Sequence, residues 1–214
     1  MSDTAIITLT ANGGVEVGTQ NNFRRAEKAK KPIAFVINKC DHENADFERT
    51  FNELKEVFGN KCTLFQYPIN AGKDFNAAID VLQGKMLVWK AEGGAPEAKD
   101  IPESEKATVE EIRAQLLEWA AESDETIMDK YFEQGTLSDD ELMRGLQTVF
   151  AEGSMYPVIC TSGLKDMGIR RLMGFLGEMT PSVADAPKPI TTEAKEVTPD
   201  PKAPASAFIF KTSV

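Results

Sequence analysis

Apolar residues along the chain recur with two different periods, and the order of these periods predicts a layered α/β fold. Residues 5–10 and 33–37 are short β-branched runs of the kind that form buried strands. Residues 20–30 lie between them and place Phe23 and Ala26 on one side of a helix. Because two strands joined by a helix favour a right-handed crossover, we expect these strands to be parallel.

The next helix and the last elements continue this first pattern. Residues 46–58 predict a helix with an aromatic stripe that packs against the sheet. Residues 156–163 predict a buried strand that ends in small polar residues, and residues 169–179 predict a helix. The side chains expected to face inward on these two helices are Phe47, Phe51, Leu54, Phe58, Ile169, Leu172, Met173 and Leu176.

A different pattern separates these two halves. Residues 63–69 alternate like one half-exposed strand, and residues 77–89 predict a hairpin or one bent strand broken at Gly84. Residues 91–102, which are rich in Gly and Pro, predict a loop. The organisation is therefore a βαβα layer, an inserted α+β segment, and a final βα pair that completes the layer.

Two helical patterns close the inserted segment. Residues 104–131 predict one long amphipathic helix or two in series. Ser138 is followed three residues later by Glu141, which predicts a capping box at the start of a helix that runs to about residue 152. The acidic outer faces of these helices are typical of solvated surface.

Beyond residue 180 the pattern fades. Residues 181–204 hold six of the eleven prolines and few large apolar residues, which predicts a linker. Residues 205–214 alternate like a strand, although a lone terminal strand needs partners that this chain does not obviously supply.

Polar residues gather where the second strand ends, at Asn38, Lys39 and Asp41. In open α/β sheets ligands bind at the carboxyl ends of the strands, and Asn-Lys-x-Asp is the guanine-reading motif of GTP-binding proteins. A carboxylate at Asp41 would accept both N1–H and the exocyclic amine of guanine, whereas adenine would leave it unpaired. Asn38 would tie neighbouring loops together, and the stem of Lys39 would lie along the base. The alternative is a surface turn with these residues by chance.

Composition narrows the class of protein. The chain has 214 residues and a net charge of −10, which argues against free-standing nucleic-acid binding and so against a DNA partner. The three cysteines have no CxxC spacing, and His42, expected to be exposed, is the only histidine. No apolar run is long enough to span a membrane, and no signal peptide is present, so a reduced, cytoplasmic protein is expected.

The order of several segments resembles bacterial elongation factor G, the translocation GTPase of the ribosome. The likeness covers essentially the whole chain. Its segments are Phe-Val-Ile-Asn-Lys-Cys-Asp at 35–41, Tyr-Pro-Ile-Asn-Ala-Gly at 67–72, Ile-Asp-Val-Leu at 79–82, Lys-Met-Leu-Val-Trp at 85–89, Met-Asp-Lys-Tyr-Phe at 128–132, Asp-Asp-Glu-Leu at 139–142, Pro-Val-Ile-Cys-Thr-Ser-Gly at 157–163 with Lys165, Gly168, Leu172, Pro181 and Ser182 after it, and Ala-Phe-Ile-Phe-Lys at 207–211.

The resemblance implies a fold and a division of the chain. The fold class would be α/β, a partial P-loop-NTPase-like G domain with a parallel sheet that carries an inserted α+β subdomain. The division would be a second half of the G domain at 1–59, the insert at 60–153, the final strand and helix of the G domain at 154–180, a linker at 181–204, and the first strand of a following β-barrel domain at 205–214.

The resemblance also implies ligands. Ser162 and Gly163 would form the second guanine loop, where the family has Ser-Ala, and GTP or GDP would be the cofactor, with magnesium in a full-length parent. No G-x-x-x-x-G-K-[ST] phosphate loop occurs, and the family's Asp-x-x-Gly segment and water-positioning histidine would precede residue 1. We therefore expect a fragment of a GTPase that binds nucleotide weakly or not at all, is itself inactive, and holds neither catalytic residues nor metal ligands.

The implied partners are the ribosome and, through acidic helices at about 110–133, the ribosomal stalk protein; the chain is expected to be a monomer. Two alternatives stay open. One is a ribosome-protection or release-factor-3-like GTPase. The other is a non-enzymatic adaptor in which the guanine motif is a relic.

Overall fold

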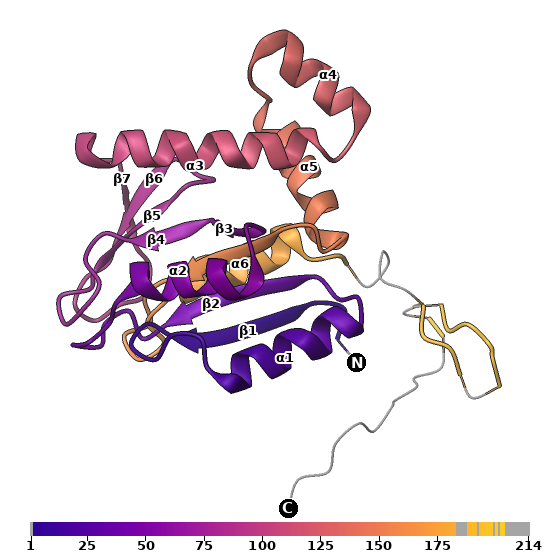
Figure 1. Ribbon diagram of the computed structural model, residues 1–214, viewed down its shortest axis with the longest axis horizontal. Helices are drawn as coiled ribbons and strands as arrows, with labels where there is room; N and C mark the ends of the chain where they lie inside the picture. Colours follow the sequence, from indigo (N-terminus) through magenta and orange to yellow (C-terminus); the bar gives the residue numbers. More distant parts are fainter. Residues whose placement is uncertain (1, 183–187, 192, 199, 201, 204–214) are drawn as a thin grey trace, which may run out of the picture.

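The computed structural model describes residues 2–182, 188–191, 193–198, 200 and 202–203, which form two adjoining sheets with helices packed on them (Figure 1). The first sheet has four parallel strands in the order β1-β2-β8-β3. Its strands are β1 (Ala5–Thr10), β2 (Ile33–Asn38), β8 (Tyr156–Cys160) and β3 (Cys62–Leu64). The predicted α/β class, a parallel sheet that carries an inserted α+β segment, is confirmed, and the inserted segment contains an antiparallel sheet.

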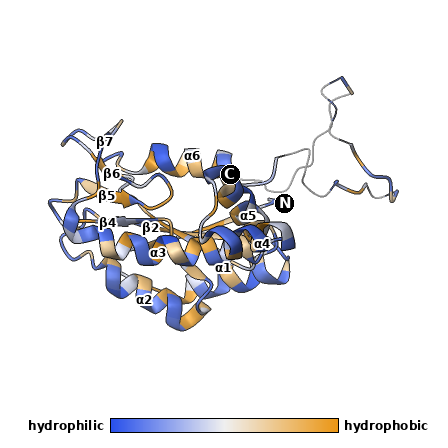
Figure 2. Cartoon of the chain, turned by 90° about the horizontal axis from the view of Figure 1, so that it is seen from above, coloured by the Kyte–Doolittle hydropathy of each residue, from blue (hydrophilic) through white to orange (hydrophobic). Residues whose placement is uncertain are grey.

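Helices cover both faces of this parallel sheet, as its fully apolar central strands require. Helices α1 (Val17–Lys28) and α2 (Phe47–Phe58) lie on one face and α6 (Ile169–Met179) on the other (Figures 1 and 2). Phe23 of α1 and Phe58 of α2 meet with ring centroids 4.3 Å apart, and Phe35 of β2 stacks on Phe58 at 5.1 Å. Aromatic packing thus fixes both helices over the central strand.

The predicted helices differ from the observed ones in detail. Helix α1 begins at Val17 and not at residue 20, although Glu16 offers no side-chain cap there. Helix α2 begins after Asp46, whose carboxylate accepts a 3.0 Å hydrogen bond from the Arg49 N–H. On α6 Met173 was expected to face inward, but it is 63% exposed, and the helix buries Phe175 instead.

The second sheet is antiparallel and belongs to the inserted segment. Its strands, in spatial order, are β4 (Gln66–Pro68), β5 (Ala77–Asp80), β6 (Lys85–Val88) and β7 (Glu97–Lys99). Of the two interpretations of residues 77–89, the hairpin is therefore correct. The expected loop at 91–102 contains β7, a fully exposed strand that exists because β6 offers it backbone partners.

The expected single strand at 63–69 is wrong, because the chain changes sheets inside it. Residues 62–64 pair with β8 in the parallel sheet, and residues 66–68 pair with β5 in the antiparallel sheet. Phe65 lies at the junction: its N–H donates to the Val158 carbonyl at 3.0 Å, and its own carbonyl accepts from the Val81 N–H at 3.1 Å. One peptide segment thus joins the two sheets.

Three helices complete the insert, α3 (Glu103–Ala121), α4 (Glu125–Gln134) and α5 (Asp139–Ala151). Two helices in series is therefore the correct interpretation of residues 104–131, and the break falls where Asp124 caps α4. The capping box of Ser138 and Glu141 is confirmed. Helices α3 and α5 pack closely at Gly145, where an added Cβ would lie 2.6 Å from the Ala120 carbonyl oxygen.

The terminal segment is only partly described. Residues 205–214, predicted as a strand, lie outside the described residues. Within the linker, Ile190 and Glu196 form one isolated antiparallel bridge. Among the residues that the structure describes, no helix has both the length and the apolar character that crossing a membrane requires.

Candidate functional site

The candidate site lies where β1, β2 and β8 end together at one edge of the parallel sheet. Backbone hydrogen bonds continue across this edge beyond the strands. The Ala11 N–H donates to the Asn38 carbonyl at 2.8 Å, and the Cys40 N–H donates to the Thr161 carbonyl at 3.1 Å. The loops that follow the three strands are therefore held side by side.

Asn38 joins the two loops that were predicted to contact guanine. Its Oδ1 accepts hydrogen bonds from the Gly163 N–H at 2.9 Å and from the Thr161 hydroxyl at 3.2 Å. Its Nδ2 donates to no group among the described residues, so one end of the amide fixes the loops and the other faces outward. The tying role predicted for Asn38 is thus present in the contacts.

Lys39 and Asp41 follow in a tight turn closed by a 3.0 Å hydrogen bond from the His42 N–H to the Lys39 carbonyl. Lys39 has a φ of +59°, a left-handed conformation that turns the chain sharply away from β2 and leaves the side chain exposed. The half-buried Asp41 carboxylate makes neither a hydrogen bond nor an ion pair within the described part of the chain. An acceptor without a protein partner at a strand end is a candidate ligand contact.

His42 is half-buried, and not fully exposed as expected from the sequence. Its Nδ1 accepts a 3.1 Å hydrogen bond from the Asn44 N–H. The imidazole therefore helps to shape the turn that carries Asp41.

Ser162 has a structural part in the second loop. Its side chain is fully buried, and its Oγ accepts a 3.2 Å hydrogen bond from the Lys165 N–H. Its backbone exchanges hydrogen bonds with Met167 at 2.9 and 3.0 Å, which closes the loop on itself. These bonds leave Gly163 and Leu164 at the exposed tip.

The tip itself differs from the sequence-based picture. The Gly163 N–H donates to Asn38 and is therefore not available to a ligand. The next amide, of Leu164, makes no hydrogen bond within the described residues and is the backbone donor that remains available. Leu164 is also 92% exposed, which places an apolar side chain at the tip of the loop that Asn38 holds. Sequence analysis missed Leu164, whose only signal is an apolar residue within a polar loop.

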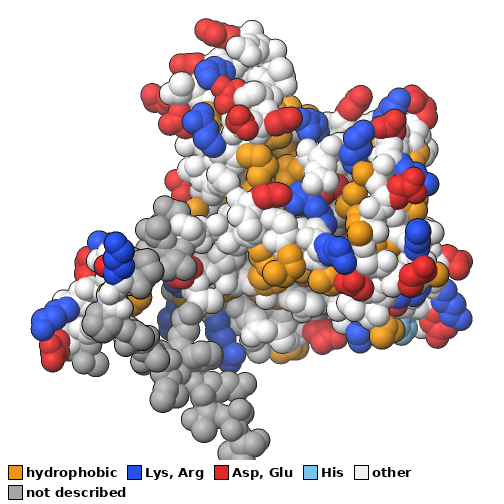
Figure 3. All heavy atoms as spheres, turned by 180° about the vertical axis from the view of Figure 1, so that it is seen from behind, with side chains coloured by type: hydrophobic (Ala, Val, Ile, Leu, Met, Phe, Trp, Pro, Cys, Tyr) orange, Lys and Arg blue, Asp and Glu red, His pale blue; other side chains and the backbone are white. Residues whose placement is uncertain are grey.

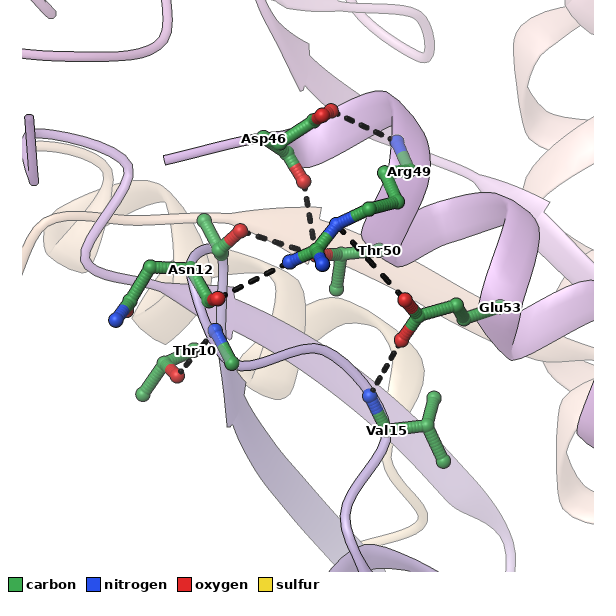
Figure 4. Close-up of polar contacts among 9 residues, drawn as sticks. Thr10, Asn12, Val15, Asp46, Arg49, Thr50 and Glu53 are labelled. Atoms are coloured by element: carbon green, nitrogen blue, oxygen red, sulfur yellow. Dashed lines mark hydrogen bonds and ion pairs between the residues drawn. The ribbon is translucent and has the colours of Figure 1, made fainter. Parts of the chain in front are cut away.

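The loop after β1 forms the third wall of this edge and is braced by α2 (Figure 4). Arg49 Nη2 donates to the Asn12 carbonyl at 3.0 Å, and Glu53 Oε2 accepts from the Val15 N–H at 2.9 Å. The Thr50 hydroxyl donates to the Ala11 carbonyl at 3.1 Å. Helix α2, which follows the Asp41 turn directly, therefore holds the neighbouring loop in place.

Two buried thiols lie beneath the site. Cys40 and Cys160 are both fully buried. Burial raises the pKa of the Cys160 thiol well above its usual range, and the adjacent Cys40 thiol raises it further. A neutral thiol is a weak nucleophile, so the Cys160 side chain serves as packing.

Within the described part of the chain, a buried charge network lies elsewhere, between β5 and α6. Asp80 is 1% exposed and pairs with the guanidinium of Arg171, which also bonds Glu178 at 2.9 Å. Burial alone would lower the pKa of Arg171, but the two carboxylates raise it above its ordinary value. This network ties β5 of the insert to α6 and does not include any residue of the candidate site.

A cavity of about 560 Å³ lies away from the candidate site, between α2 and the insert. Phe51, Leu64 and Ile69 contribute to its apolar lining. It does not include Asn38, Asp41 or Ser162, so the polar groups that converge at the sheet edge mark the better candidate for chemistry.

Comparisons with known proteins relate this fold to a known family. Residues 1–182 match the family described as the elongation factor Tu GTP binding domain. An elongation factor G-like protein of Thermotoga maritima is 33% identical over 218 residues, which cover all of this chain and 31% of that protein. A crystal structure from Thermus thermophilus matches with a TM-score of 0.77 and 26% identity, over 86% of this chain and 27% of that one.

The chain thus spans about a third of the length of the curated relative that it matches. The family match covers both sheets, the insert and every predicted site residue. By sequence and by fold, this chain belongs to the family of the elongation factor Tu GTP binding domain.

Proposed function

We propose that this chain reads the guanine base within an elongation factor G-like translational GTPase. In the proposal, the Asp41 carboxylate accepts N1–H and the exocyclic amine of guanine. Adenine presents an acceptor at N1 and no neighbouring amine, so it would leave a desolvated carboxylate unpaired. The carboxylate therefore selects guanine by rejecting adenine.

The observation that carries this proposal is the bridge made by Asn38. Its side chain accepts from Gly163 and Thr161, which holds the Asp41 turn and the second loop at one edge without using Asp41 itself. A surface turn of chance composition has no reason to combine a bridging amide with an adjacent carboxylate that lacks a protein partner.

The other residues at the edge fit a planar, partly apolar ligand. The exposed stem of Lys39 offers one apolar surface, and the exposed Leu164 side chain offers another. The Leu164 N–H and the Asn38 Nδ2 are donors without partners among the described residues. These groups suit the carbonyl and ring-nitrogen acceptors of guanine, and we propose Asn38, Lys39, Asp41, Ser162 and Gly163 as the base site, with Ser162 acting through loop closure.

Affinity for the nucleotide should nevertheless be low. Phosphate and magnesium contacts supply most of the binding energy in P-loop GTPases, and the chain contains no phosphate-loop sequence. Base contacts alone should give a dissociation constant well above about 1 µM. We propose that efficient binding and hydrolysis need the remainder of a longer protein.

The decisive experiment exchanges the specificity. Guanosine and xanthosine are titrated against the chain and against Asp41→Asn, with amide shifts as the readout. Xanthosine carries a carbonyl where guanosine carries its amine, so the side-chain amide introduced at position 41 should donate to it, and preference should move from guanosine to xanthosine. Glu48→Gln, at an exposed carboxylate without an ion pair among the described residues, is the control and should keep the guanosine preference. Absence of guanosine shifts in both proteins would favour an adaptor with a relic site.

For the longer protein, we propose action on the ribosome, with the insert as a docking surface for the stalk protein. Acidic side chains gather on the lobe that carries α4 (Figure 3). Exposed acidic residues on α3, at its C-cap and on α4 include Glu118, Glu122, Asp129 and Glu133. Such a surface would attract a basic partner.

The docking proposal is tested by charge reversal in the longer protein. Asp129→Lys with Glu133→Lys should reduce stalk-dependent GTPase stimulation, and Glu56→Lys on α2 should not. Unchanged stimulation in the double variant would leave these residues as ordinary solvated surface. A ribosome-protection or release-factor-3-like role would show stalk dependence without translocation activity.

A further inference from the structure

Two turns of the insert, at residues 72–73 and 93–94, contact the two loops proposed to bind the base, which carry Asp41 and Ser162. In the first turn, the Gly72 N–H donates to the Cys40 carbonyl at 2.8 Å, and the Lys73 carbonyl accepts from Lys165 Nζ at 2.8 Å. In the second turn, the Gly94 N–H donates to the Asp166 carbonyl at 3.0 Å. The insert therefore touches both the Asp41 turn and the loop of Ser162.

Gly93 makes the closest of these approaches. It has a φ of +74°, and a Cβ built on it would lie 1.7 Å from the Lys165 carbonyl oxygen and 3.3 Å from that of Asp166. The first distance is far inside van der Waals contact, and both neighbours are backbone atoms that no rotamer change can move. Only glycine allows the insert turn and the loop to occupy their observed positions.

We infer that Gly93 is a positioning residue for guanine recognition, and that the insert sets the geometry of the base site through this contact. The inference rests on the proposed function. It makes the insert a support for base reading as well as an outer surface. A shift of the turn at Gly93 would displace the loop that Asn38 holds.

The path from Gly93 to the base site is short and runs mainly through backbone groups. The carbonyls of Lys165 and Asp166 meet the turn at Gly93 and Gly94. The Lys165 N–H bonds the buried Ser162 hydroxyl, and the neighbouring Gly163 N–H bonds Asn38. Moving the Lys165 carbonyl therefore pulls on the two bonds that shape the tip of the loop.

A matched pair of glycine variants isolates this contact. Gly93→Ala adds a methyl that collides with the Lys165 carbonyl. Gly94→Ala adds the same methyl at a φ of +87° with nothing within 4 Å, and it keeps the N–H that bonds Asp166. Both variants carry the backbone strain of alanine at positive φ, but only the first displaces the loop.

The first readout needs no ligand. Amide hydrogen exchange of Gly163 and Lys165 should rise about tenfold in Gly93→Ala relative to Gly94→Ala, because the bonds to Asn38 and Ser162 open more often. As a control, the amide hydrogen exchange rates of residues in β1 should be the same in the two variants. Equal exchange at Gly163 in both would overturn the inference.

The second readout is guanosine titration followed by amide shifts. Gly93→Ala should weaken guanosine binding about tenfold at an unchanged urea midpoint relative to Gly94→Ala, because the base contacts lose their alignment. If the unmodified chain shows no guanosine shifts, the proposed function fails while the exchange readout still decides the role of Gly93. Guanosine binding with equal affinities in the two variants would reject the positioning role alone.

A side-chain variant covers the case in which Gly93→Ala does not fold. Lys165→Met removes the ammonium bond to the Lys73 carbonyl and keeps the loop backbone. It should raise Gly163 exchange about threefold. Lys90→Met, at an exposed lysine beside the same turn, is the control and should leave exchange unchanged. No difference between these two lysine variants would count against coupling through the insert.

Discussion

The N–H of Gly163 donates a 2.9 Å hydrogen bond to the side-chain oxygen of Asn38, a residue 125 positions earlier in the chain. The same oxygen accepts from the hydroxyl of Thr161, which is 1% exposed. One amide therefore sets the spacing of the two loops at the sheet edge. The stability of this edge should depend on that amide more than on any exposed residue around it.

Asn38→Ala should open the second loop and destabilise the chain. The buried Thr161 hydroxyl loses its acceptor, which costs about 1–3 kcal/mol of unfolding free energy. Gly163 exchange should rise in parallel. Urea unfolding with amide exchange measures both effects. Asn44→Ala, at an exposed asparagine whose side chain has no hydrogen bond among the described residues, is the control and should leave both unchanged.

Gly163→Ala, which restores the Ser-Ala of the family pattern, should fold normally. A Cβ there would lie 3.6 Å from both terminal atoms of Asn38, an ordinary contact, so the smaller entropy of the unfolded chain should add about 0.4–1 kcal/mol of stability. Gly168→Ala is the contrast, because its φ is +81° and its Cβ would lie 2.8 Å from the Cys160 carbonyl. In thermal unfolding, the midpoint of Gly163→Ala should lie above that of the unmodified chain, and the midpoint of Gly168→Ala should lie below it.

Arg171→Met should strongly destabilise the junction between insert and sheet. The substitution leaves the Asp80 carboxylate buried without its cation, which costs about 3–5 kcal/mol. Arg170→Met is the matched control, because Arg170 is exposed and forms no ion pair within the described chain, and its effect should stay within about 0.5 kcal/mol. Urea denaturation measures both. Similar midpoints would show that the Asp80 pair contributes little.

Gly145→Ala and Gly177→Ala should differ in sign although both glycines are helical. At Gly145 of α5 a methyl would collide with Ala120 of α3, and forcing the helices apart costs about 1–3 kcal/mol. At Gly177 of α6 nothing lies within 4 Å, so alanine should stabilise by up to about 1 kcal/mol through helix propensity. Equal midpoints in the two variants would contradict the close crossing of α3 and α5.

The helix α5 cap should weaken in acid. Lys130 and the Ser138 hydroxyl lower the pKa of Glu141 from 4.5 to about 2. A pKa that is lowered in the folded state gives a stabilisation that is complete above the unfolded value of 4.5 and disappears as pH falls toward 2. When the helix content of the chain is followed from pH 6 to pH 2, the loss of helix content should be smaller in Glu141→Gln than in the unmodified protein. Glu133→Gln is the control and should follow the unmodified curve.

Sequence periodicity predicts the parallel layer well, because β1, β2, β8 and their helices each bury one continuous apolar face. It fails at Phe65, because alternation continues unbroken while the hydrogen-bonding partners change from one sheet to the other. It also fails at β7, whose Glu-Ala-Lys sequence has no strand propensity and pairs only because β6 has an open edge.

In the candidate site, too, some features can be predicted from the sequence and others cannot. Asn38, Lys39 and Asp41 are visible in the sequence because a short motif follows a short apolar run. The bond between Asn38 and Gly163, the exposed Leu164, and the contact of Gly93 with Lys165 depend on how distant segments pack. The local sequence pattern does not predict which distant residues contact each other, so these features can be identified only in the folded structure.

The peptide at Phe65 makes the insert a stiff arm. Its N–H bonds to Val158 of the parallel sheet, and its carbonyl bonds to Val81, directly after β5. The insert is therefore fixed where it joins the parallel sheet and cannot rotate as a flexibly linked domain would. A force applied to α4 at the outer end of the insert would therefore be transmitted as torque to β8. This strand leads into the Ser162 loop.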